Sequence, residues 1–247
     1  MTVRYLVISD IHSNLQALQA VLEYAEFRYS QILCCGDLVG YGADPNAICD
    51  FARARVAMQV RGNHDRVCAR LEEPDWFSES AKAAVLWTRE VLEPSNTEFL
   101  ATLPTGPIAA GEACLVHGSP RDEDEYLDDQ TILEVQAEAK CPLTFFGHTH
   151  AQGGYAFRDG AIRRLGRQFE PLQNVSFQLE EGWYYLVNPG SVGQPRDGDP
   201  RAAFVLYDPD ERTIQFQRVV YDVAAAQSRI RAEGLPDFLA ERLADGM

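Results

Sequence analysis

Short apolar runs that each end in a polar, ligand-type motif are the feature of this chain that most constrains its fold. Val3–Ser9, Gln31–Cys35 and Ala57–Val60 read as buried strands, and helical patterns separate them. The first helical pattern begins near Leu15, with Ser13 or Asn14 as its N-cap, and the second follows Asp44-Pro45. Strands that alternate with helices form βαβ crossovers around a parallel sheet core. The sequence therefore predicts an α/β fold.

Each of these strands, and two later ones, leads into a motif rich in Asp, Asn or His. The motifs are Asp10-Ile11-His12, Gly36-Asp37, Gly62-Asn63-His64-Asp65, Val116-His117-Gly118 and Gly147-His148-Thr149-His150, and they contain all five histidines of the chain. One such motif alone would more often cap a turn or place a histidine in the core. Imidazole, carboxylate and amide groups together suit divalent cations, and ligand sites form at the carboxyl edge of parallel strands. Five motifs in this order favour a shared metal site.

The remaining elements are predicted from periodicity and turn residues. Residues 66–103 are expected to be helical, with one helix over Ser78–Leu92 and a capping box at Ser95-x-x-Glu98. Pro107–Ala110 and Ala113–His117 are expected to form a hairpin, followed by a helix over about Thr131–Lys140 and a strand at Leu143–Phe146. Hairpin turns are expected at Arg158-Asp159-Gly160, Glu181-Gly182 and Pro209-Asp210. The last element is a helical segment over Asp222–Leu243, interrupted at Gly234-Leu235-Pro236. We expect one domain over residues 1–247, with a helical segment at 66–103 and a C-terminal helical extension at 222–243.

The charge balance disfavours nucleic-acid polymers as partners. The chain has 22 basic and 37 acidic residues, so its net charge is 22 − 37 = −15. An acidic surface repels the phosphate backbone, whose binding rests on Lys and Arg. No apolar run approaches the ~20 residues that span a bilayer, and the N-terminus lacks the pattern of a signal peptide. We therefore expect a cytoplasmic protein without a membrane partner.

The six cysteines carry no C-x-x-C spacing. We expect them to be small buried residues rather than a disulfide framework or a thiolate zinc site. The neighbouring Cys34 and Cys35 should point to opposite faces of a strand.

Taken in order, the five motifs resemble the signature of the calcineurin-like metallophosphoesterases. The resemblance covers about residues 3–207 and is closest to small prokaryotic predicted phosphodiesterases, which share runs such as Cys35–Gly42 and Asn188–Arg196. It implies a four-layered α/β/β/α sandwich of two mixed β-sheets flanked by helices. It also implies a metal-dependent hydrolase of phosphate esters that acts on a small phosphorylated molecule or nucleotide.

The resemblance assigns roles to the matching residues. The implied metal ligands are Asp10, His12 and His150 for one ion, Asn63, His117 and His148 for a second, and Asp37 as the bridge between them. The ions would be two divalent transition metals, manganese foremost, with iron, zinc, cobalt or nickel also compatible. A water shared by both ions would become the hydroxide that attacks phosphorus. His64 would protonate the leaving oxygen, the alternative being that it merely orders its turn.

The chain departs from the protein Ser/Thr phosphatases of this superfamily at one motif. Those enzymes carry Gly-Asp-x-x-Asp-Arg-Gly, whereas this chain has Gly40 and Tyr41 in place of the second Asp and the Arg. The departure argues against protein phosphatase activity. It also removes the carboxylate that orients the catalytic histidine, and it leaves Asp65 as the candidate replacement.

Substrate-binding residues are less well marked. The candidates for a phosphate clamp are Arg61, Arg121 and Arg196, the last being the best placed by resemblance, and for each the alternative is a solvated surface arginine. Tyr41 and Trp76 could flank a base or simply pack in the core or on the surface. The acidic run Asp122–Asp129 is expected to be a solvated loop.

Two further functions compete with a general phosphoesterase. One is a hydrolase of dinucleoside polyphosphates, which related hydrolases make conceivable. The other is a non-catalytic interaction scaffold, as in the retromer subunit that resembles this family. The full ligand set together with His64 favours an enzyme. A homo-oligomer is compatible with either reading.

Overall fold

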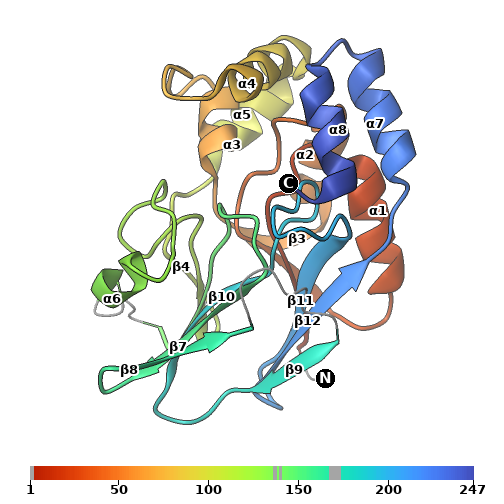
Figure 1. Cartoon of the computed structure of the whole chain (residues 1–247). Helices are drawn as coiled ribbons and strands as arrows, with labels where there is room; N and C mark the ends of the chain where they lie inside the picture. Colours follow the sequence, from red (N-terminus) through yellow and green to blue (C-terminus); the bar gives the residue numbers. More distant parts are fainter. Residues whose placement is uncertain (1–2, 136–137, 139–140, 167–173) are drawn as a thin grey trace.

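Two mixed sheets form the centre of the molecule. The computed structural model describes residues 3–135, 138, 141–166 and 174–247. The strands are β1 (Tyr5–Ile8), β2 (Gln31–Cys34), β3 (Val56–Gln59), β4 (Ile108–Ala110), β5 (Ala113–Leu115), β6 (Leu143–Phe145), β7 (Gly153–Arg158), β8 (Ala161–Leu165), β9 (Val175–Gln178), β10 (Tyr184–Asn188), β11 (Ala202–Asp208) and β12 (Thr213–Val219). The first sheet has the order β3-β2-β1-β11-β12-β9, and the second has the order β4-β5-β6-β10-β7-β8 (Figure 1).

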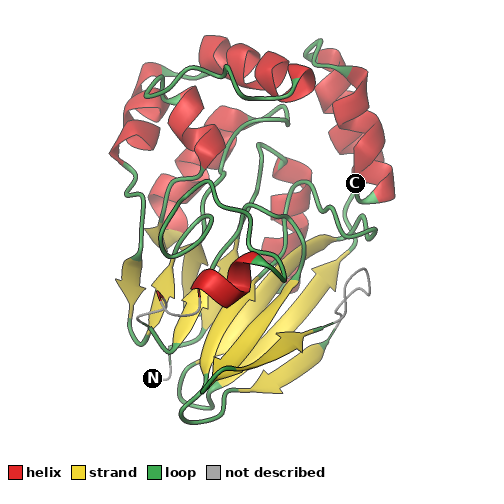
Figure 2. Ribbon diagram, turned by 60° about the vertical axis from the view of Figure 1, so that its left-hand side comes forward, coloured by secondary structure: helices red, strands yellow, loops and turns green. Residues whose placement is uncertain are grey.

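The helices are distributed unequally over the two sheets. They are α1 (Leu15–Tyr24), α2 (Pro45–Arg55), α3 (Asn63–Cys68), α4 (Glu79–Val91), α5 (Pro94–Thr102), α6 (Thr131–Val135), α7 (Val223–Ala232) and α8 (Asp237–Asp245). All except α6 contribute to the core on the outer face of the first sheet or stand beyond its end, whereas the short α6 packs on the second sheet. Figure 2 shows this contrast between a thick and a thin outer layer.

The core lies in three layers between the sheets and helices. Along β1, Leu6 and Ile8 face the helices and Val7 faces the second sheet, as the alternation of a strand requires. Cys34 and Cys35 likewise belong to different core layers, which confirms their opposite directions. The predicted four-layered α/β/β/α sandwich of two mixed sheets is confirmed.

Each sheet contains a set of three parallel strands. In the first sheet β1 pairs in parallel with β2, and β2 with β3. In the second sheet β6 lies in parallel between β5 and β10. The carboxyl ends of these strands lead into the loops that carry the sequence motifs. The predicted arrangement of motifs after strands is therefore present in both sheets.

Local signals explain where several helices begin. Asn14 is the N-cap of α1, and its side chain accepts a hydrogen bond from the backbone N–H of Ala17. Pro45 opens α2, as predicted. The C-terminal segment forms α7 and α8 with an interruption at Gly234-Leu235-Pro236, also as predicted.

Two predicted signals are wrong. The helix α5 begins at Pro94 with Glu93 as its N-cap, so Ser95 lies inside the helix and forms no capping box. The N–H of Glu93 is satisfied instead by the side chain of Asn46.

Glu181-Gly182 is not a hairpin turn, because β9 belongs to the first sheet and β10 to the second. The segment between them crosses from one sheet to the other. The helix expected over Thr131–Lys140 is described as far as Val135, and residues 136–137 and 139–140 lie outside the described part.

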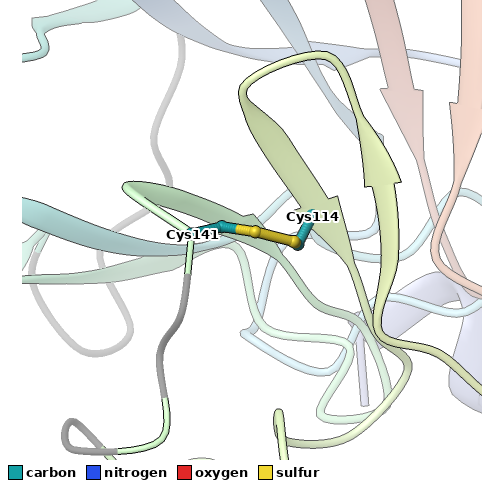
Figure 3. Close-up of a disulfide and its surroundings, with 2 residues drawn as sticks. All are labelled: Cys114 and Cys141. Atoms are coloured by element: carbon teal, nitrogen blue, oxygen red, sulfur yellow. A yellow bond between two sulfur atoms is a disulfide. The ribbon is translucent and has the colours of Figure 1, made fainter.

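The prediction that all six cysteines are unpaired is wrong for two of them. Cys114 in β5 and Cys141 just before β6 form a disulfide, with their Cα atoms 6.0 Å apart (Figure 3). The pairing follows from the parallel neighbourhood of β5 and β6, which brings together residues 27 positions apart. The other four cysteines are free and buried, as expected.

Thiol titration of the denatured, unreduced protein is expected to find four reactive cysteines out of six. A crosslink around a loop of this length contributes about 3 kcal/mol to the free energy of unfolding. Cys141→Ser should therefore lower the unfolding midpoint in non-reducing buffer. In excess dithiothreitol the wild type should unfold close to the variant. Six reactive thiols in the unreduced protein would contradict the pairing.

Among the described residues, no helix combines the length and the apolar character that a membrane crossing requires.

Candidate metal centre

The seven residues expected to bind metal converge at one place. Their ligand atoms form two groups, in each of which all atoms lie within 4.8 Å of one another. The first group is Asp10, His12, Asp37 and His150, and the second is Asp37, His117 and His148. Asn63 joins the second group, because its Oδ1 lies 3.2 Å from Nε2 of His117. Asp37 belongs to both groups, which is the position that a bridging ligand occupies.

Backbone hydrogen bonds hold the motif loops together. The N–H of Asp10 donates to Gly36, and that of His12 donates to Asp37. In the second sheet the N–H of Gly147 donates to the carbonyl of His117. The loop after β10 joins the same assembly, because the Ser191 hydroxyl donates to the carbonyl of Asp10 at 2.7 Å. The positions of the side chains are therefore fixed relative to one another.

Three of the imidazoles are oriented through their Nδ1 atoms. Each donates to a backbone carbonyl: His12 to Val39 at 2.9 Å, His117 to Cys35 at 2.7 Å and His150 to Gln194 at 2.6 Å. The Nε2 atom of each ring is then left facing the centre. His148 is turned the other way, with Nε2 against the carbonyl of Asp124 and Nδ1 facing the centre, 3.2 Å from Nε2 of His117. Such outer hydrogen bonds fix the tautomer of metal-binding histidines.

The spacing of the inward atoms fits cations. Nε2 of His12 and Nε2 of His150 face each other at 3.0 Å. In each ring the proton is on Nδ1, which donates it to a backbone carbonyl, so neither Nε2 has a proton to share with the other. Nε2 of His117 lies 3.4 Å from Asp37, as does Nε2 of His150 from Asp10. Ligand atoms about 2.1 Å from one ion are separated by about 3.0–3.4 Å. Oδ2 of Asp10 is also buried without a partner among the described residues. The lone pairs on Nε2 of His12 and Nε2 of His150 repel each other unless a cation lies between them.

Burial and neighbouring charge set the protonation of these groups. Burial lowers the pKa of His148 to about 3 and holds the pKa values of His12 and His150 well below their usual range. Burial opposes the charged forms of His117 and Asp37, but their mutual attraction prevails. It raises the pKa of His117 to about 10 and holds the pKa of Asp37 well below its usual range. Neutral imidazoles and an ionised carboxylate are the forms that bind metal, so a cation bound beside Asp37 would displace the proton of His117.

The backbone is strained at the same residues. Asp10, His12, Asp37, His148 and His150 all have positive φ angles, between 47° and 65°. Residues other than glycine rarely adopt this conformation, and it persists only where the surroundings impose it. Five of the seven expected ligands thus hold a conformation that local sequence preference disfavours.

His64 lies next to this centre, in the first turn of α3. Its backbone N–H donates to Oδ1 of Asp37 at 2.9 Å. Its ring packs against Tyr41 and Phe77, with centroid distances of 4.4 Å and 4.7 Å. Nδ1 of His64 is buried and has no partner among the described residues. Burial lowers the pKa of His64 to about 4, so the ring is neutral here.

Asp65 does not orient His64. Its carboxylate accepts hydrogen bonds from the backbone N–H groups of Val39 and Gly62, at 3.1 Å and 3.0 Å. It therefore fixes the turn that leads into α3 and joins that turn to the loop after β2. The candidate role of Asp65 as the orienting partner is wrong, since its oxygens are directed to the backbone.

Gly40 contacts the His64 ring directly. A Cβ atom at this position would lie 2.3 Å from Nδ1 of His64, and Gly40 has a φ of +87°. The ring and any side chain at position 40 cannot occupy this space together. The departure from the protein phosphatase motif is therefore coupled to the placement of His64.

Gly40→Ala is expected to displace His64 and to lower turnover by about 10²-fold or more, because a misplaced proton donor loses its contribution. Metal content should be unchanged, since the ligands lie beyond the ring. Gly160→Ala is the matched control, having a φ of +81° and no atom within 4 Å of an added Cβ. Equal turnover in the two variants would contradict the coupling.

Of the three candidate arginines, the structure brings Arg196 to the centre. Its guanidinium donates to Oε1 of Gln194 and to the Tyr41 hydroxyl, and it lies over the Tyr41 ring at 5.6 Å. Arg61 is paired with both oxygens of Glu123, and Arg121 is paired with Glu125 and Glu134. Neither of these two lines the pocket above the centre.

The acidic run is only in part the solvated loop that was expected: Asp122, Tyr126, Asp128 and Asp129 are exposed, whereas other residues of the run are held in contacts. Glu123 and Asp124 pair with Arg66, and Glu123 also pairs with Arg61. Main-chain and side-chain groups of the run then contact the centre: the carbonyl of Asp124 accepts from His148, and the Tyr126 ring packs on His148 at 4.2 Å. The prediction considered charge alone, whereas arginines on the first half of the chain hold this segment against the site.

A pocket of about 290 Å³ opens above the centre. Its walls include Asn63, His64 and Arg196, which the sequence indicated, and Tyr41 and Trp76, which it left open. The wall residues that sequence reasoning missed are Phe77, Ser78, Ala81, Tyr126 and Arg242. Only the aromatic pair Trp76-Phe77, in an otherwise polar connection, could have signalled such a role. Arg242 carried no signal, because it reaches the pocket from the last turn of the C-terminal helix.

Comparison with known proteins identifies the family of the chain. Residues 3–212 match the calcineurin-like phosphoesterase superfamily domain. The crystal structure of a metallophosphoesterase from Sphaerobacter thermophilus is 36% identical in sequence, with 100% of each chain covered and a TM-score of 0.86. Hypothetical protein PH1004 from Pyrococcus horikoshii shares the fold, at 21% identity over 99% of each chain and a TM-score of 0.75. The uncharacterized protein MJ0912 of Methanocaldococcus jannaschii is 36% identical over 243 residues, 96% of each sequence. The chain belongs to the calcineurin-like phosphoesterase superfamily.

Proposed function

We propose that the protein is a dinuclear metal-dependent hydrolase of phosphate esters that acts on a small molecule or nucleotide. The observation that carries the proposal is the position of Asp37, whose carboxylate is shared by two groups of inward-facing ligand atoms. A carboxylate between two cations offsets their repulsion and fixes their spacing. Two divalent cations held there would supply an acidified water and stabilise charge on the phosphoryl oxygens. Manganese is the first candidate.

The residues of the chain would divide the remaining tasks. Asp10, His12 and His150 would hold one cation, and Asn63, His117 and His148 would hold the other. Arg196 lies at the pocket wall, where its guanidinium can bind a phosphoryl oxygen. Tyr41 positions this guanidinium through its hydroxyl and its ring.

His64 is the proposed proton donor to the leaving oxygen. Its ring lines the pocket, and Asp37 holds its backbone, so the side chain can act beside the metals without binding them. The neutral ring can donate a hydrogen bond from one nitrogen. The negative charge of a bound phosphoryl group favours the protonated ring, as an opposite charge does for any buried histidine.

The test is hydrolysis of a substrate panel by the purified protein, with added Mn²⁺ and with a chelator. The panel contains bis-nitrophenyl phosphate, nitrophenyl phosphate and diadenosine tetraphosphate. The proposal expects hydrolysis of at least one compound in Mn²⁺ and its loss in the chelator. No hydrolysis of any compound, together with no bound transition metal by elemental analysis, would instead support a non-catalytic scaffold.

The second candidate is a hydrolase of dinucleoside polyphosphates. The observation that favours it is the presence of two arginines, Arg196 and Arg242, in the walls of one pocket. A marked preference for diadenosine tetraphosphate over both nitrophenyl esters would select this function.

A further inference from the structure

A second arginine reaches the pocket from outside the part of the chain that matches the family. Arg242 lies in α8, beyond residues 3–212. It lines the pocket together with Arg196, which comes from the loop after β10, and with Trp76 and Phe77. Figure 1 shows why this is feasible: α8 and the helices α3, α4 and α5 stand at the same end of the sheets.

The two guanidinium groups have different neighbours. Tyr41 packs on the His12 ring at 4.7 Å, and Arg196 lies over Tyr41. Arg196 is thus one side chain removed from a metal ligand. The guanidinium of Arg242 lies over the Phe238 ring at 5.2 Å, and its Nε donates to the terminal main-chain oxygen of Met247.

Neither arginine is neutralised by an acidic side chain. Within the described part of the chain, no carboxylate side chain lies at ion-pair distance from Arg196 or Arg242. The only carboxylate in the described pocket wall is Asp37, which the metal centre uses. Burial, followed by the charge of Arg196, lowers the pKa of Arg242 to about 10. In a chain with net charge −15, the two guanidinium groups form a local concentration of positive charge in this wall.

We infer that Arg196 and Arg242 form a subsite for a second phosphate group of the substrate, next to the phosphate that is hydrolysed. The inference rests on the proposed function, since it places the scissile phosphate at the metals. Two guanidinium groups in the wall of one pocket repel each other, and an anion bound by both removes that repulsion. A guanidinium group can donate two parallel hydrogen bonds to the oxygens of a phosphate. Substrates with two adjacent phosphates are therefore preferred over those with one.

The test compares the binding of two non-hydrolysable probes, methylenediphosphonate and methylphosphonate. Each is titrated by calorimetry into Mn²⁺-loaded protein from which free Mn²⁺ has been removed. We expect the wild type to bind the diphosphonate more tightly. Arg242→Gln should lower this preference by about 10- to 100-fold, the value of one charged hydrogen-bonded contact. Arg242→Lys should retain part of it, because the charge remains.

Arg231→Gln is the matched control. Arg231 lies on α7 and pairs with Asp237 on the surface, away from the pocket. Its variant should keep the wild-type preference. An Arg242→Gln variant that unfolds at the wild-type temperature and keeps the full preference would overturn the subsite. Binding of the probes needs no turnover, so the two proposals can fail separately. If Arg242→Gln loses the preference but the wild type hydrolyses no ester, the proposed function is refuted and the subsite is not.

Discussion

Asp37→Asn is expected to lower turnover by about 10³-fold or more and to remove at least one of two bound cations per chain. Asp37 belongs to both ligand groups, so its loss affects both ions at once. An amide has no charge with which to offset the repulsion between two cations. The metals supply several kcal/mol of stabilisation to the transition state, and each 1.36 kcal/mol is a factor of ten.

The measurement pairs elemental analysis with steady-state kinetics on the same preparation. Asp44→Asn is the matched control, because Asp44 is also largely shielded from solvent but pairs with Arg229 outside both groups. It should keep the wild-type metal content and turnover. Two ions per chain and full turnover in Asp37→Asn would refute the bridging role.

His64→Ala is expected to lower turnover by about 10²- to 10⁴-fold while leaving the metal content unchanged. The substitution removes the imidazole but keeps the backbone N–H that donates to Asp37, so the ligand that joins both groups stays oriented. The ring is not a member of either group. The effect should therefore appear in catalysis and not in metal binding.

Esters with different leaving groups sharpen this prediction. A proton donor matters most for a poor leaving group, so His64→Ala should affect an alkyl ester more than a nitrophenyl ester. An equal loss on both, accompanied by loss of metal, would show that His64 acts by holding the turn together. Unchanged turnover would remove His64 from the mechanism.

The convergence of the ligands could be predicted because each step is local or topological. Hydrophobic periodicity alone predicts the strands that precede Asp10, Asp37 and His117. Parallel pairing of the strands then brings their carboxyl ends to one edge of the sheet. Asn63 and His64 follow the same logic, although the structure places them in the first turn of a helix rather than in a loop.

The features that could not be predicted depend on contacts between distant segments. The acidic run contacts His148 because Arg61 and Arg66 hold it there. Cys114 and Cys141 meet because β5 and β6 are neighbours, which no cysteine spacing encodes. Arg242 reaches the pocket only through the packing of the C-terminal helix. In each case the two residues that meet are far apart in the sequence, so no local pattern predicts their contact.

The two-metal centre can be tested by anomalous diffraction from crystals grown in Mn²⁺, recorded at the manganese absorption edge. Two peaks per chain are expected, about 3.5–4 Å apart, with the Asp37 carboxylate between them. One peak should lie among Asp10, His12 and His150, and the other among Asn63, His117 and His148. A single peak, or two peaks that do not share Asp37, would contradict this expectation.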